Sequence, residues 1–145
     1  MVQNSDMSEK GLETVIAESL VNDAGYIKGS PKDYDREHAI DLVQLVEFIR
    51  ETQPDIFDYL SLATDNPKRI KFLHRLQGEI AKRGVIDVLR LGVHDGPIKL
   101  ELFYGTPSAY NLKAKNLYSK NRFSVTRQLH YSNDNTRLAL DMVIF

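Results

Sequence analysis

The sequence predicts an α/β protein in which N-terminal helices pack on a mixed or antiparallel sheet that ends in a C-terminal β-hairpin. Apolar residues recur at helical spacing up to about residue 84, and apolar and polar residues alternate in the last part of the chain. The length of 145 residues suits one domain. We therefore expect a single domain with residues 1–8 disordered, 9–84 mostly helical and 85–145 mostly in strands.

Helices are predicted throughout the first part of the chain. The apolar spacing indicates one helix over residues 8–23 and a second over 35–52. Pro54 is well placed to begin a short third helix. The fourth is the clearest, because Asn66 can cap its start and Gly84 can end it.

Strands are predicted in the second part. Residues 85–93 fit either a helix or a buried strand, and 98–104 alternate as a strand does. Residues 109–120 form a basic link, helical or irregular. Two further alternating runs, 123–131 and 137–145, flank a polar turn at 132–136 and predict the closing β-hairpin.

Composition excludes several classes of protein. The chain has no cysteine and no apolar run of about 18 residues, and its start lacks the features of a secretory signal. These observations favour a cytoplasmic protein without a membrane segment. The net charge of −1 hides an asymmetry, because residues 1–65 hold fourteen Asp and Glu against five Lys and Arg, whereas residues 66–145 hold six against fourteen. The basic part could face a polyanion. The simpler interpretation is that acidic and basic helices lie against one another.

Asp141 is the most informative single residue. It interrupts a final strand that is apolar on both faces, which predicts a central strand covered on both sides. A buried carboxylate requires a partner. With a turn at 132–136, Arg127 would lie directly opposite Asp141 and could pair with it. A divalent metal such as Mg²⁺ is the alternative, and from these residues alone the ion pair is the favoured interpretation.

The other sequence motifs give weaker evidence of function. The four histidines show no metal-binding spacing, and no phosphate-binding loop, nucleophile elbow or dinucleotide motif is present. Several tyrosines lie among basic residues, where they could stack on bases, but tyrosines in strands are more often part of a core.

Four segments in order carry a specific resemblance: RGVIDVLRLGV (83–93), LELFYGTPS (100–108), FSVTRQLHYS (123–132) and RLALDMVIF (137–145). The chain resembles the N-terminal PD-(D/E)xK-type nuclease domain of the restriction (R) subunit of type I restriction–modification enzymes. The likeness extends from about Leu12 and is densest from about Phe72 onward.

The resemblance implies a restriction-endonuclease-like fold and a Mg²⁺-dependent deoxyribonuclease acting on unmethylated double-stranded DNA. In such R subunits an ATP-driven motor follows the nuclease, and modification and specificity subunits are its partners. Asp141 corresponds to the catalytic, metal-binding Asp, and Glu13 is a second acidic residue matched to the site. The basic second half is the expected DNA-facing side, with four candidate phosphate contacts, although each taken singly is more simply a solvated surface charge: Lys113, Lys115, Lys120 and Arg122.

The chain departs from the family pattern in one respect. No Asp or Glu in it is followed two positions later by Lys, so the Glu-x-Lys part of the metal site is missing. We therefore expect a truncated domain that is inactive by itself, and one in which Asp141 alone holds Mg²⁺ only weakly. The alternatives are a non-catalytic module for DNA binding or subunit assembly, and a binding protein for an acidic small ligand.

Overall fold

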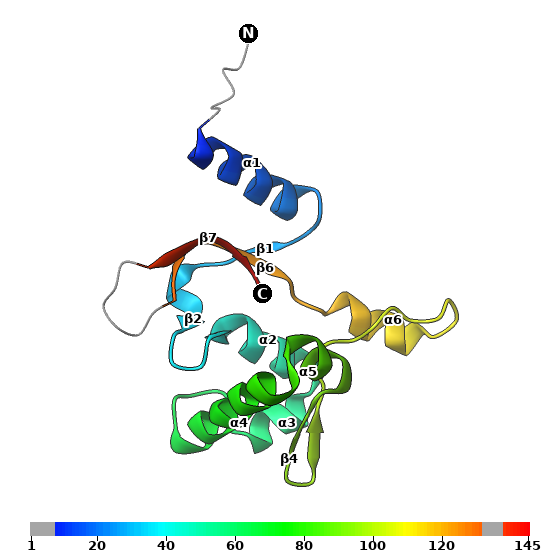
Figure 1. The fold of residues 1–145 in the computed structure, drawn as a ribbon. Coiled ribbons are helices and arrows are strands. Elements are labelled where there is room, and N and C mark those ends of the chain that lie inside the picture. Colours follow the sequence, from blue (N-terminus) through cyan, green and yellow to red (C-terminus); the bar gives the residue numbers. More distant parts are fainter. Residues whose placement is uncertain (1–7, 132–137) are drawn as a thin grey trace. The chain divides into compact units, whose positions relative to one another are not determined.

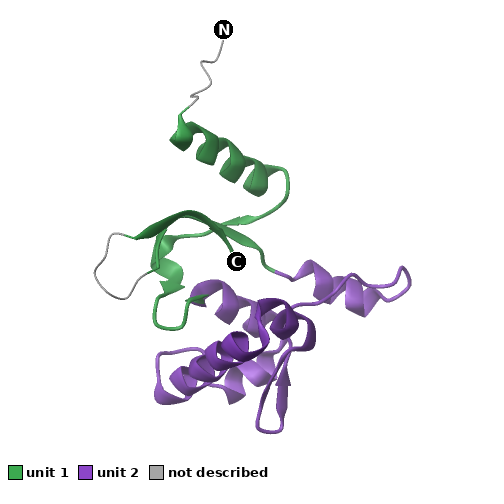
Figure 2. Cartoon of the chain, viewed as in Figure 1, with its two compact units in different colours: residues 1–41, 122–145 green, residues 42–121 purple. Residues whose placement is uncertain are grey.

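The computed structural model describes residues 8–131 and 138–145 (Figure 1). The disorder predicted for residues 1–8 falls, up to residue 7, outside the described residues, as does the predicted turn at 132–136. The α/β class is confirmed, because six helices accompany a small mixed sheet with a C-terminal hairpin of strands among these residues. Within the single domain that the length predicts, the chain forms two compact units (Figure 2): unit 1 comprises residues 1–41 and 122–145, and unit 2 comprises residues 42–121.

Unit 1 joins the two ends of the sequence. Ser8, predicted to be disordered, is instead the N-cap of the first helix, and its Oγ accepts a hydrogen bond from the Gly11 N–H. The elements of this unit are α1 (Glu9–Asn22), β1 (Ile27–Lys28), η1 (Pro31–Asp33), β2 (Tyr34–Asp35), β3 (Ile40–Asp41), β6 (Ser124–His130) and β7 (Ala139–Ile144).

The sheet of unit 1 is mixed, with strand order β1-β6-β7. Strand β1 pairs with β6 in parallel, and β6 pairs with β7 antiparallel. The parallel pair passes very close at Gly29, whose N–H donates to the Val125 carbonyl at 2.9 Å. A Cβ on Gly29 would lie 2.2 Å from Thr126 Oγ1, so this position excludes a side chain.

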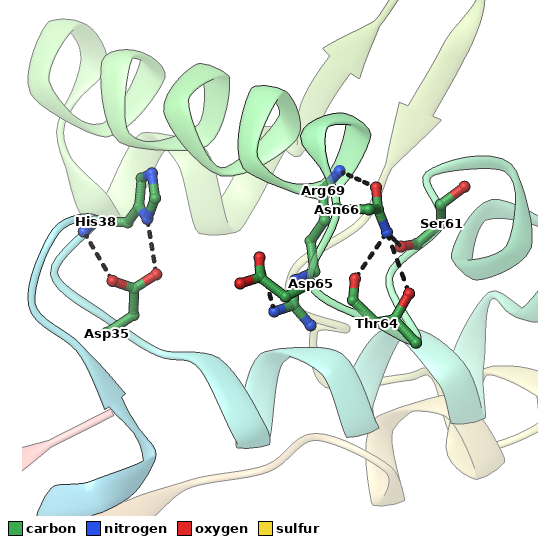
Figure 3. A network of polar contacts seen from close by, with 7 residues as sticks. All are labelled: Asp35, His38, Ser61, Thr64, Asp65, Asn66 and Arg69. Carbon is green, nitrogen blue, oxygen red and sulfur yellow. Dashed lines mark hydrogen bonds and ion pairs between the residues drawn. The ribbon is translucent and has the colours of Figure 1, made fainter.

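The helix predicted over 35–52 begins only at Leu42, and residues 34–41 form the antiparallel pair β2–β3 instead. Asp35 accepts hydrogen bonds from the backbone N–H groups of Glu37 and His38 at 3.0 and 3.4 Å, and its Oδ2 lies 2.7 Å from His38 Nδ1 (Figure 3). Ala39 then takes a left-handed backbone, with φ of 57°. Such local bonds from an Asp side chain compete with helix formation, which explains why apolar spacing alone was misleading here.

Unit 2 is mainly helical. Its elements are α2 (Leu42–Thr52), α3 (Pro54–Tyr59), α4 (Pro67–Arg83), α5 (Val85–Leu91), β4 (Val93–Asp95), β5 (Ile98–Leu100) and α6 (Leu112–Ser119). The predicted limits of α4 are confirmed: the Asn66 Oδ1 accepts from the Arg69 N–H (Figure 3), and Gly84 ends the helix with φ of +86°. The ambiguous segment 85–93 is mostly the helix α5, and among the described residues after 84 the helices α5 and α6 accompany the strands β4, β5, β6 and β7.

The apolar core of the chain lies largely in unit 2. Its buried side chains come from the helices, from the turn after α3 and from both short strands: Phe48, Ile49, Phe57, Leu60, Leu62, Phe72, Leu73, Leu76, Val88, Val93 and Leu100. The predicted strand 98–104 ends at Leu100 because Gln53 occupies the next pairing position. Its Nε2 donates to the Glu101 carbonyl at 2.8 Å, and its Oε1 accepts from the Glu101 N–H at 2.9 Å.

Unit 1 buries more polar groups. Beside Val125 and Leu129, its buried side chains include Asp41 and Ser124, whose Oγ donates to the Asp41 carboxylate at 3.1 Å. Within the described ranges, no helix combines the length and the apolar character needed to cross a membrane.

Candidate metal centre

Three carboxylates from opposite ends of the sequence meet in unit 1. Glu9 and Glu13 lie on the first turns of α1, and Asp141 lies in β7. One oxygen of each side chain lies within 4.8 Å of an oxygen of the other two. We call Glu9, Glu13 and Asp141 the acidic trio. The structure thus brings together the two acidic residues that the family resemblance selected, and it adds a third.

Glu13 is the anchored member of the trio. Its side chain is only 12% exposed, and its Oε2 accepts a hydrogen bond from Arg127 Nη2 at 3.1 Å within an ion pair. Arg127 Nη1 also donates to Thr14 Oγ1 at 3.1 Å, and Gln128 Nε2 lies 3.3 and 3.4 Å from the two Glu13 oxygens. A carboxylate held by a guanidinium and an amide has a fixed position, so Glu13 provides a rigid point in the site.

The backbone of β6 is distorted where it meets Glu13. Successive side chains of a regular strand point to opposite faces, yet both Arg127 and Gln128 reach the same carboxylate. Gln128 has φ of +52°, a left-handed conformation that non-glycine residues rarely adopt. This local departure from the strand conformation allows two adjacent residues to contact Glu13.

The expected pairing of Arg127 with Asp141 is wrong by one residue in register. Arg127 pairs with Met142 and Leu129 pairs with Leu140, so Asp141 lies across from Gln128. The ion-pair partner of Arg127 is Glu13 in place of Asp141. The prediction assumed a five-residue turn at 132–136, and a strand with apolar residues on both faces gives no independent signal of its register.

The expected burial of Asp141 is also wrong. Among the described residues β7 pairs only with β6 and forms an edge of the sheet. Asp141 is exposed, as are the apolar neighbours Leu140 and Ile144 at 45% and 53%. Water therefore solvates the carboxylate, and the energetic need for a buried partner disappears.

The four candidate DNA contacts differ in exposure. Lys113 and Lys115 are exposed on α6, whereas Lys120 and Arg122 are half-buried. Helix α6 has no buried residue, and Asn111 caps it by accepting from the Ala114 N–H. The sequence has no Asp or Glu from residue 102 to residue 133. The two lysines of α6 therefore lie in a long stretch that carries only positive charge.

Sequence reasoning missed Glu9. The available signal was its spacing: Glu9 and Glu13 are four residues apart, which puts both carboxylates on one face of a helix. Two acidic side chains on one face repel each other unless a cation lies near them. Here Arg127 neutralises Glu13, and the charges of Glu9 and Asp141 remain exposed to solvent.

The trio suits a hard divalent cation. Carboxylate oxygens are the ligands that Mg²⁺ prefers, and Mg²⁺ usually takes one or two carboxylates with water and phosphate oxygens in the other positions. Exposed Glu9 and Asp141 can supply those carboxylates, and Glu13, fixed beside them, can offer a third ligand oxygen. No sulfur or imidazole ligand belongs to this cluster, which disfavours a zinc-type site.

Comparisons of the chain with protein-family models, with curated proteins and with solved structures found no match.

Proposed function

We propose that this chain is a nuclease-type domain that binds a divalent metal ion and double-stranded DNA, of the kind found in the R subunit of type I restriction–modification enzymes. The observation that carries the proposal is the acidic trio. Glu13 was selected from the sequence resemblance and Asp141 from that resemblance and its place in an apolar strand, and they lie 128 positions apart in the chain. Their carboxylates nevertheless meet at a spacing that one metal ion can bridge.

The trio would hold Mg²⁺ through Glu9, Glu13 and Asp141. A bound ion supplies positive charge to a phosphate oxygen and lowers the pKa of a coordinated water. The sequence predicts weak Mg²⁺ binding because it offers Asp141 as the only ligand. Because two further carboxylates lie beside it, we propose a site that binds the ion with all three acids and loses affinity when any one of them is neutralised.

DNA cleavage is proposed for the parent enzyme only. The 145 residues contain no Asp- or Glu-x-Lys triplet, so the lysine that manages the proton of the attacking water in this family has no counterpart here. By the same resemblance, the ATP-driven motor, the modification and specificity subunits as partners, and a cytoplasmic location belong to the proposal for the whole R subunit.

The basic stretch supports DNA as the partner. Lysines that contact phosphates release condensed counterions and give an affinity that falls steeply with salt. Exposed Lys113 and Lys115 lie on a helix that buries none of its residues, and Tyr110 beside that helix is 98% exposed. A helix of eight residues gains little stability in isolation, so contacts to a phosphate backbone would stabilise α6.

Manganese binding followed by electron paramagnetic resonance tests the metal site. We expect Asp141→Asn and Glu9→Gln each to weaken Mn²⁺ binding by about tenfold or more, as loss of a metal-site group commonly does. Glu18→Gln is the matched control, because Glu18 is also an exposed glutamate on α1 but does not belong to the trio. Equal Mn²⁺ affinity in the wild type and Asp141→Asn would contradict the proposal.

Duplex binding separates this proposal from a non-catalytic DNA-binding or assembly module. If the trio positions a metal against phosphate, Mg²⁺ should strengthen duplex binding by the wild type and not by Asp141→Asn. If the chain binds DNA through its basic surface alone, the wild type and Asp141→Asn should bind the duplex equally, with and without Mg²⁺.

A further inference from the structure

A groove of about 390 Å³ lies beside the acidic trio within unit 1. One face of α1 forms one wall, and β1, the start of η1 and β6 form the rest. The lining residues include Thr14, Ala17, Glu18, Val21, Lys28 and Arg127. This volume is within the range of ordinary ligand sites.

The groove and the trio are continuous. Arg127 and Thr14 line the groove, and Arg127 also holds Glu13 of the trio through its Nη2. Along α1, Glu13, Ala17 and Val21 are spaced by four residues and therefore lie on one face of the helix. A chain-like ligand that reaches the trio can thus continue along α1 into the groove.

The chemistry of the groove fits a nucleic acid strand. Lys28, Arg127 and Glu18 are its charged lining residues, and because Arg127 is paired with Glu13, Lys28 is the lining cation that can contact a phosphate. Lys28 is exposed in β1 and can direct its ammonium group to a phosphate, while the half-buried Ala17 and Val21 offer apolar surface to the sugar. Alternating anionic and apolar contacts are the pattern that a sugar-phosphate backbone presents.

We propose that this groove is a backbone subsite, in which Lys28 contacts a phosphate of the DNA strand that flanks the bond held at the trio. The inference rests on the proposed function, because it assigns a strand path to the same site. It adds a specific residue, since Lys28 was not among the basic residues that the sequence selected. Arg127 then links the two parts, with Nη2 on Glu13 and its guanidinium at the border of the groove.

The test compares Lys28→Ala with Lys32→Ala in the full chain. Lys32 is an exposed lysine in η1 that does not line the groove, so it controls for the loss of one positive charge. Binding to a short fluorescent DNA duplex is measured by anisotropy in Ca²⁺ over a range of salt. We expect Lys28→Ala to weaken binding about three- to tenfold and to reduce the slope of log K against log salt by about one, with a much smaller effect for Lys32→Ala.

Neutral methylphosphonate linkages, introduced one at a time, locate the contact. One linkage should weaken binding by the wild type while leaving Lys28→Ala unaffected. Inorganic phosphate at millimolar concentration should not displace the duplex from the groove, because a free anion lacks the sugar contacts and the connection to the trio.

The outcomes separate the two proposals. If Lys28→Ala and Lys32→Ala bind the duplex equally, or if no single linkage accounts for the Lys28 effect, the groove is not a strand subsite and this inference is wrong. If the wild type binds no duplex with or without a divalent ion, the proposed function itself is wrong.

Discussion

Neutralising Asp141 should stabilise the metal-free protein, although this change removes a proposed ligand. The three carboxylates of the trio have oxygens within 4.8 Å of one another. Two unit charges at this distance repel by about 0.9 kcal/mol in a medium as polar as water and by about 3.5 kcal/mol at an effective permittivity near 20. Asp141 and Glu9 are exposed, so the lower value applies to that pair, and Arg127 offsets the charge of Glu13.

Asp141→Asn should therefore gain about 1 kcal/mol in low salt, which corresponds to a rise of about 3 °C in Tm for a chain of this size. High salt should remove the gain, since the Debye length at 1 M falls to about 3 Å. Mg²⁺ should raise the Tm of the wild type more than that of the variant, because a ligand that binds only the folded state stabilises it in proportion to its affinity.

Thermal unfolding followed by circular dichroism, in EDTA and then in Mg²⁺, measures both effects. Glu18→Gln again serves as the control for removing one negative charge from the surface near α1. A Tm for Asp141→Asn that is lower than that of the wild type, or no higher than that of Glu18→Gln, would show that the carboxylates do not face one another as the structure places them.

Three further predictions concern the contacts that hold each unit together. A double-mutant cycle of Arg127→Met and Glu13→Gln should give a coupling energy of about 1–2 kcal/mol in urea unfolding, because Glu13 is only 12% exposed; a value near zero would contradict the ion pair. Gln53→Ala should cost about 1–3 kcal/mol, since it leaves both backbone groups of Glu101 without their partner, and Gln53→Glu, which cannot donate, should also destabilise the protein. Burial raises the pKa of Tyr104 above its usual value, so the folded state holds this proton more tightly than the unfolded chain does. The resulting stability is complete below the unfolded pKa of about 10 and is lost as the pH rises through the folded pKa, and Tyr104→Phe should remove that alkaline loss when urea unfolding is compared at about pH 8 and about pH 11.

Local signals predicted the helices well where a cap defines an end. Asn66 and Gly84 marked α4 because the amide side chain and the left-handed glycine act within a few residues of the backbone they satisfy. The same kind of local effect was missed at Asp35, whose carboxylate turns the chain at 36–39 and delays the start of α2 to Leu42. Apolar periodicity does not report such turns, because it records only which residues are apolar.

The partners of Asp141 could not be obtained in the same way, because they depend on contacts between distant parts of the chain. Residue type identified Asp141, but the position of β7 at the sheet edge decided that it is exposed. A shift of one residue in the pairing of β6 with β7 moved Arg127 away from the position opposite Asp141. The ion pair was therefore predicted with the correct cation and the wrong acid.

The left-handed backbone at Gln128 determines how β6 meets Glu13, the acid that Arg127 contacts in place of Asp141. Had β6 kept the regular alternation, only one of Arg127 and Gln128 could have faced α1, and Glu13 would have one fewer polar partner. Backbone strain of this kind persists only where surrounding contacts compensate for it. Two polar side chains on one glutamate provide that compensation, and they hold Glu13 beside Glu9 and Asp141 without using either of those exposed carboxylates. The distortion in β6 thus fixes one acid of the trio and leaves the other two in solvent, an arrangement that suits the divalent cation we propose for this site.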